Sequence, residues 1–137
     1  MIRRKRIWKS LVCAAAMSML CACGNIIHTA KIMEPSEVYT GKEIRSAMNV
    51  VIGFFFFHYD GCTLKQLEYN EEFSTKRSDE WAEQYGADEA IVLLSEFEVD
   101  HTGGDGSLEP NSTYRKWQWI LVRDNGGAWR LKTWGYG

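Results

Sequence analysis

Cysteine is the first residue type in this 137-residue chain whose spacing suggests chemistry. Cys13, Cys21 and Cys23 cluster near the N-terminus, whereas Cys62 lies alone near the middle of the chain. Clustered cysteines are compatible with a metal site, a disulfide framework or a point of covalent attachment. Only the residues around the cluster distinguish these possibilities.

The residues around the cluster favour export from the cytoplasm. Five of the first nine residues are basic, namely Arg3, Arg4, Lys5, Arg6 and Lys9, and an uncharged run follows over residues 11–22. A basic start before a short apolar run is typical of an export signal. Because a membrane-spanning helix needs about 20 apolar residues, we expect a signal region rather than a permanent anchor. A metal site is disfavoured, because a charged metal centre inside the signal would block translocation.

The end of the apolar run, Leu20-Cys21-Ala22-Cys23, resembles the lipobox of bacterial lipoproteins. In that motif a Leu stands three residues before the modified Cys, with small residues between them. The resemblance implies cleavage after Ala22 and attachment of diacylglycerol to the Cys23 thiol. Cys13 and Cys21 fit less well, because neither directly follows a small residue. The alternative is an ordinary cleaved signal peptide, which would release an unlipidated protein.

Charge argues against a nucleic-acid partner once the signal peptide, residues 1–22, is removed. Of the 16 basic residues five precede Cys23, which leaves 11 basic against 18 acidic residues and a net charge of −7. Such a domain lacks the basic surface that binding to phosphates requires. The expected partners are membrane lipid, through acylated Cys23, and another envelope protein or a small ligand. Cys62 then has no second cysteine nearby in sequence, and we expect a small buried side chain, with a reactive thiol as the alternative.

The other residues that could do chemistry form no recognisable catalytic set. His28, His101 and His58 fall in the N-terminal segment, in a polar loop and at the end of a helix, where a partial positive charge is favourable. Acid–base catalysis needs a titratable group in a water-poor cleft, and none is evident. Asp100 and Asp105 share a loop with Glu109, but their spacing does not match a calcium loop. We therefore expect no metal, no cofactor and no catalytic residues.

Aromatic residues near the C-terminus are the stronger indication of a site. They lie on two adjacent predicted strands and are Trp117, Trp119, Trp129, Trp134 and Tyr136. A surface of exposed rings could bind a sugar, a peptide or a partner protein. The alternative is that cross-strand aromatic pairs only stabilise the sheet.

The N-terminal half predicts a tether followed by a long helix. Residues 23–40 have weak periodicity, and we interpret them as a lipidated tether before a domain over residues 41–137. Apolar residues at helical spacing predict a helix over residues 41–59, with a capping box formed by Thr40 and Glu43. Its second half, which includes residues 54–57 (FFFF), is apolar nearly all round. We favour burial of this half in the core over a second membrane contact, and any exposed Phe would form an adhesive patch.

The rest of the chain predicts a sheet. A strand over 63–69 is followed by a short helix that begins at Ser78 and then by strands over 90–100, 114–123 and 128–136, the last two joined by a tight turn. Strict alternation places Tyr114 on the opposite face from Trp117 and Trp119, and Trp134 and Tyr136 on the opposite face from Trp129. The expected fold is α+β, with the long helix and the short helix packed on a curved antiparallel sheet of about four strands.

Several blocks of the domain resemble a family of small, clostridial-type bacterial lipoproteins built on a domain of unknown function. The blocks are GCTLKQLEY, ADEAIVLLSEFEVD, GDGSLEPNSTYRKWQWILVR and GGAWRLKTWGYG. The resemblance implies a nuclear-transport-factor-2-like or cystatin-like fold, in which a curved sheet cradles the long helix to form a cone. It transfers no catalytic residue.

Together these features predict a membrane-anchored, extracytoplasmic lipoprotein that acts as a non-enzymatic binding or protein-interaction module. One alternative is an enzyme that uses the pocket of the cone. Another is an accessory lipoprotein of a larger envelope assembly.

Overall fold

Five strands and two helices make up the part of the chain that the structure, a computed structural model, describes: residues 23–137. The predicted signal peptide lies outside the described residues. The elements, in chain order, are β1 (Ala30–Met33), α2 (Gly41–His58), β2 (Cys62–Tyr69), α3 (Glu71–Gln84), β3 (Glu89–Val99), β4 (Thr113–Arg123) and β5 (Arg130–Gly135). The predicted α+β class is confirmed.

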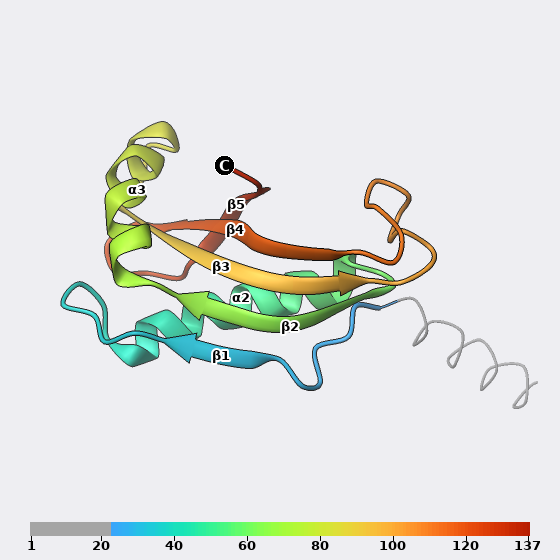
Figure 1. Ribbon diagram of the computed structural model, residues 1–137. Coiled ribbons are helices and arrows are strands. Elements are labelled where there is room, and N and C mark those ends of the chain that lie inside the picture. Colours follow the sequence, from blue (N-terminus) through green and yellow to red (C-terminus); the bar gives the residue numbers. More distant parts are fainter. Residues whose placement is uncertain (1–22) are drawn as a thin grey trace, which may run out of the picture.

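The sheet is mixed rather than antiparallel, and it has one strand more than predicted. Its strand order is β1-β2-β3-β4-β5, with β1 parallel to β2 and all other neighbours antiparallel. The additional strand, β1, comes from the predicted tether: Lys31 pairs with Leu67 and Met33 with Tyr69. A strand of four residues carries too short an alternation to be recognised from sequence. The sheet is neither closed nor strongly curled, so the predicted cone is not formed (Figure 1).

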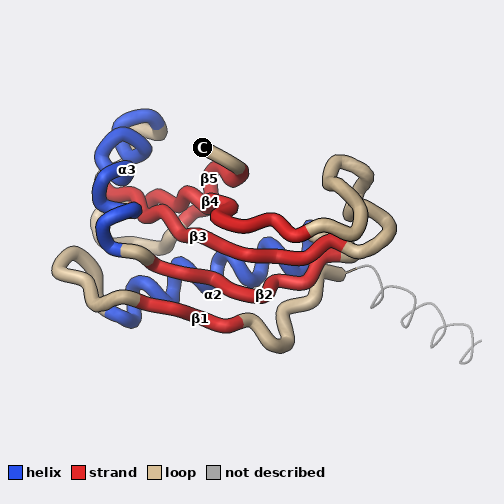
Figure 2. Tube along the Cα trace, in the orientation of Figure 1, coloured by secondary structure: helices blue, strands red, loops and turns tan. Residues whose placement is uncertain are grey.

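Helix α2 runs along one face of the sheet and covers the main core on that face (Figure 2). The capping box is confirmed: the Glu43 N–H donates to Thr40 Oγ1 at 3.2 Å, and the Thr40 N–H donates to Glu43 Oε2 at 2.7 Å. The buried side of the helix consists of Ile44, Ala47, Met48, Val51 and Phe55. These side chains pack against one face of β2, β3 and β4. No helix within residues 23–137 is long and apolar enough to cross a bilayer.

Helix α3 packs on the opposite face, at one end of the sheet, where Ala82 contacts Ala90 of β3 (Figure 1). Its predicted start at Ser78 is wrong, because Asn70 is the N-cap and its side chain accepts a hydrogen bond of 2.9 Å from the Phe73 N–H. The helix buries little of its surface, and its polar sequence therefore shows no apolar stripe. Ser74 joins it to the sheet by accepting a hydrogen bond of 3.0 Å from the Val92 N–H.

Irregularities in β4 and β5 move aromatic side chains to the α2 face. Ser95 pairs with Trp117 but Phe97 pairs with Tyr114, and Lys116 lies between them with φ of 54°. The extra residue reverses the alternation. Tyr114 therefore shares a face with Trp117, and the prediction of opposite faces is wrong.

A second shift, between β4 and β5, has the same effect on Trp134. Leu121 pairs with Leu131 and Ile120 with Thr133, so one residue of β5 has no partner. Trp134 therefore lies on the α2 face together with Leu131, contrary to strict alternation. The tight turn that joins the strands is confirmed: Asn125 and Gly126 have φ of 52° and 65°, and the Gly127 N–H donates to the Asp124 carbonyl at 2.9 Å.

Candidate functional site

Aromatic side chains gather on the α2 face beside the C-terminal end of α2. The cluster contains Phe54, Tyr59, Phe97, Tyr114, Trp117, Trp119, Trp134 and Tyr136. Ring centroids of Phe54 and Trp134 are 4.6 Å apart, and those of Trp117 and Tyr136 are 5.1 Å apart. The cluster lies between helix α2, the loop over residues 100–112 and the C-terminal residues.

Exposure rises from the centre of this cluster to its rim. Trp119 is fully buried and its indole N–H donates to Ser95 Oγ at 2.7 Å, so it belongs to the core. Trp117 is half-buried, whereas Trp134 and Tyr136 are 42% and 61% exposed. Of the five residues predicted to form a binding surface, the structure thus brings four together and leaves two of these well exposed.

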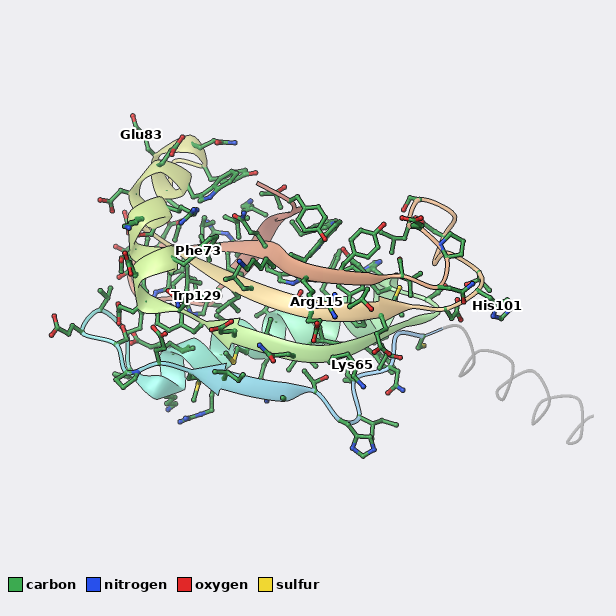
Figure 3. The ribbon with its side chains drawn as sticks, viewed as in Figure 1. Lys65, Phe73, Glu83, His101, Arg115 and Trp129 are labelled. Atoms are coloured by element: carbon green, nitrogen blue, oxygen red, sulfur yellow. The ribbon has the colours of Figure 1, made fainter. Side chains whose placement is uncertain are left out.

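The fifth predicted residue, Trp129, lies apart from this cluster. It is buried beside Tyr39, with ring centroids 5.5 Å apart, and its indole N–H donates to the Glu43 carbonyl at 3.1 Å. The guanidinium of Arg123 lies 4.3 Å from its ring centroid. Trp129 lies far along the sheet from the loop that carries His101 (Figure 3), and its surroundings are those of a core residue.

A pocket of about 370 Å³ opens at the rim of the cluster. Its walls come from the end of α2 and the start of β2, from the loop over residues 100–112 and from β5. They include Phe54, His58, Tyr59, Cys62, Asp105, Leu108 and Trp134. The loop can close over this end because Gly103 has φ of 73°, a conformation that favours glycine, and its carbonyl accepts from the Leu108 N–H at 3.3 Å. The pocket is therefore partly apolar, with one carboxylate at its edge.

Three titratable groups of the pocket, Tyr59, Cys62 and Asp105, are poorly suited to acid–base or thiol chemistry at neutral pH. Burial raises the pKa of Tyr59 well above its ordinary value, and burial together with nearby carboxylates raises the pKa of Cys62 to about 11. The hydroxyl and N–H of Ser107 lower the pKa of Asp105. The phenol and the thiol are therefore protonated and the carboxylate is ionised, so none of the three has a pKa near 7. The predicted burial of Cys62 is confirmed.

One polar atom beside the pocket wall lacks a well-formed hydrogen bond. Trp117 Nε1 is buried and forms no hydrogen bond with any of the described residues. Its N–H lies close enough to the Tyr59 hydroxyl to lower the pKa of that group, although burial of Tyr59 has the larger and opposite effect. A buried donor without a partner is uncommon and costs free energy.

The loop carboxylates do not converge on a common point. Asp100 accepts from Thr102 and Asp105 from Ser107, each within its own turn. Among the described residues, no group of three or more His, Cys, Asp or Glu side chains could hold a metal ion. The carboxylates of Asp100 and Asp105 are thus each engaged by a hydroxyl and an N–H of a nearby residue.

Cys23, the predicted point of lipid attachment, lies directly against the domain. The N–H of the next residue, Gly24, donates to the Phe56 carbonyl at 2.9 Å, and the Asn25 N–H donates to the Cys62 carbonyl at 2.8 Å. This arrangement differs from the predicted tether over residues 23–40, because backbone hydrogen bonds and β1 hold much of that segment to β2 and α2.

Comparisons of the chain with protein-family models, with curated proteins and with solved structures give no match. The site is therefore interpreted from its own geometry. Sequence reasoning missed Phe54 and Leu108 as pocket residues, because both look like ordinary core positions. The two reversals of strand alternation, which bring Tyr114 and Trp134 to this face, leave no sequence signal beyond the aromatic residues themselves.

Proposed function

We propose that the protein is a membrane-anchored extracytoplasmic lipoprotein that serves as a non-enzymatic binding module. The lipobox that ends at Cys23 supports the anchor. The acidic composition of residues 23–137 argues against nucleic acid as a partner. We include in this proposal the resemblance to clostridial-type lipoproteins with a nuclear-transport-factor-2-like or cystatin-like fold. The long helix on one face of the sheet is compatible with that fold.

The observation that carries the binding function is the pocket beside Trp134. Its indole is 42% exposed, contacts Phe54 and forms one wall of a space of about 370 Å³. Aromatic walls favour a ligand with a flat apolar face, and the carboxylate of Asp105 favours one that donates hydrogen bonds or carries positive charge. A sugar ring or a peptide segment of the cell envelope has these properties.

The same pocket gives less support to the alternative of an enzyme. Catalysis by proton transfer needs a group whose pKa is close to the working pH. The pKa shifts of Tyr59, Cys62 and Asp105 all lead away from neutrality. These three groups therefore favour holding a ligand over transforming it, and His58 is the pocket residue that the enzyme alternative would use.

Intact-mass measurement of protein purified from a bacterial membrane tests the anchor. The wild type should lack residues 1–22 and carry a diacylglyceryl adduct, and Cys23→Ala should lack the adduct. An unlipidated, freely secreted wild type would contradict the anchor and reopen the soluble alternatives.

Site-specific photo-cross-linking in cells tests the binding site. A photoreactive amino acid in place of Trp134 should give adducts with an envelope component, whereas the same amino acid at Trp81, a half-buried indole on α3, should not. Adducts in equal amounts at both positions, or at neither, would contradict a ligand at this pocket.

A further inference from the structure

The point of lipid attachment has almost no freedom to move away from the domain. Besides the two hydrogen bonds at Gly24 and Asn25, the Leu64 N–H donates to the Asn25 carbonyl at 2.9 Å. The backbone at Gly24 passes so close to α2 that an added Cβ would lie 2.5 Å from the Phe55 carbonyl oxygen. Cys23 directly precedes Gly24, which is hydrogen-bonded to α2. A lipid on Cys23 would therefore be held at a fixed position on the domain.

The surface around this position is apolar and exposed. Ile27 is 79% exposed and Phe57 is 71% exposed, two of the most exposed large apolar side chains in residues 23–137. Phe56 connects them: it lines a shallow depression of about 210 Å³ with Cys23 and Ile27, and its ring centroid is 5.0 Å from that of Phe57.

Charge separates this surface from the remainder of the domain. The described chain has a net charge of −7, yet residues 23–29 and 54–59 contain no Asp, Glu, Lys or Arg. An anionic leaflet would repel much of the domain but not these two segments. Exposed Phe and Ile in uncharged segments are the side chains that an interfacial layer of lipid accepts most readily.

We infer that Cys23, Ile27, Phe56 and Phe57, here called the anchor surface, lie on the membrane itself, with the domain resting directly on the lipid leaflet. The inference rests on the proposed acylation of Cys23. The observations favour lipid as the partner of this surface, because an acyl chain on Cys23 enters the leaflet. No flexible linker between Cys23 and the domain would let the domain move away from the leaflet. The domain is then oriented, with α3 pointing away from the membrane.

Quenching by spin-labelled lipid measures this orientation. The lipidated full chain, with its adduct verified by mass, is reconstituted in phosphatidylcholine–phosphatidylglycerol vesicles containing doxyl-labelled lipid. A thiol-reactive fluorophore is placed on Phe57→Cys, and in a matched variant on Glu83→Cys at the distant tip of α3 (Figure 3). Wild type, with Cys62 buried, controls for background labelling. Quenching should be several-fold stronger at position 57 than at position 83, and equal quenching would overturn the inference.

Gly24→Val tests whether the hydrogen-bonded connection sets the orientation. The added side chain collides with the Phe55 carbonyl and should free the anchor from α2. Quenching at position 57 should then fall while the mass of the adduct stays unchanged, and unchanged quenching would contradict a fixed anchor. Self-quenching of the fluorophore at position 57 in vesicles without doxyl-labelled lipid would show that this surface contacts a second copy of the protein. That result would overturn the inference. A missing adduct would instead contradict the proposed function, so the two failures are distinguishable.

Discussion

Ser95 is a buried polar residue that satisfies the indole N–H of Trp119. Its Oγ accepts the hydrogen bond of 2.7 Å from the Trp119 indole N–H, and both residues are buried at the centre of the aromatic cluster. Ser95→Ala should lower the free energy of unfolding by about 1–3 kcal/mol, because the indole N–H loses its acceptor inside the core. Urea unfolding measures the loss. Ser46→Ala, on the exposed side of α2, should change stability little, and equal effects of the two substitutions would contradict this role.

Arg123 is the buried charge of the domain, and it makes stability depend on pH. It donates to Glu89 and, at 2.9 Å, to Glu43, whose pKa is lowered by the Thr40 N–H and by Arg123. Because the folded pKa of Glu43 lies below the unfolded one, its contribution is present above the unfolded pKa and is lost as the pH falls through the folded pKa.

Glu43→Gln should therefore reduce stability at pH 7 but have a smaller effect at pH 3. The variant removes the charge beside Arg123 and leaves an acceptor for the Thr40 N–H. Urea unfolding of wild type and variant at both pH values measures the difference. Glu83→Gln, at the tip of α3, controls for the loss of one surface charge. A difference between wild type and Glu43→Gln that is the same at pH 7 and pH 3 would exclude the titration of Glu43 as its cause.

At the scale of elements, the irregularity in β4 places one residue in an unfavourable backbone conformation. Lys116 has φ of 54°, a left-handed conformation that costs a side chain about 1–2 kcal/mol. Lys116→Gly should therefore raise stability by up to about 1 kcal/mol. Glu98→Gly, in the regular part of β3, should lower it by about the same amount. Thermal unfolding compares the two, and loss of stability in both variants would mean that the Lys116 side chain contributes more than its backbone strain costs.

The elements show which structural features a sequence can reveal. The capping box at Thr40 and the turn over residues 124–127 follow from local residue types, and both are confirmed. The sequence predicts too late a start for helix α3, because the helix buries so little that no apolar period marks its first half. The predicted faces of Tyr114 and Trp134 are wrong, because strand irregularities depend on the pairing partner and not on the strand alone. The aromatic residues could thus be identified from sequence, whereas their convergence on one pocket could not.

At the scale of the whole molecule, the segment before α2 contributes to stability as well as carrying the proposed attachment point. A chain that begins at residue 41, the predicted domain boundary, lacks β1 and exposes the edge of β2. It also loses the Thr29 hydroxyl, which donates to the Leu64 carbonyl at 2.9 Å, and the packing of Ile26 and Met33 on the core. An uncovered sheet edge is also a surface for aggregation.

A chain of residues 41–137 should therefore melt well below one of residues 23–137, by about 10 °C for the loss of roughly 2 kcal/mol in a domain of this size. A chain of residues 30–137 keeps β1 but loses the hydrogen bonds of Gly24 and Asn25, so its melting temperature should lie between the other two. Calorimetry at matched concentration, with light scattering to detect association, measures all three. Identical melting temperatures would mean that residues 23–40 add nothing to the fold and behave as a tether after all. The domain could then stand away from the membrane, and the close approach inferred from the anchor surface would lose its structural basis.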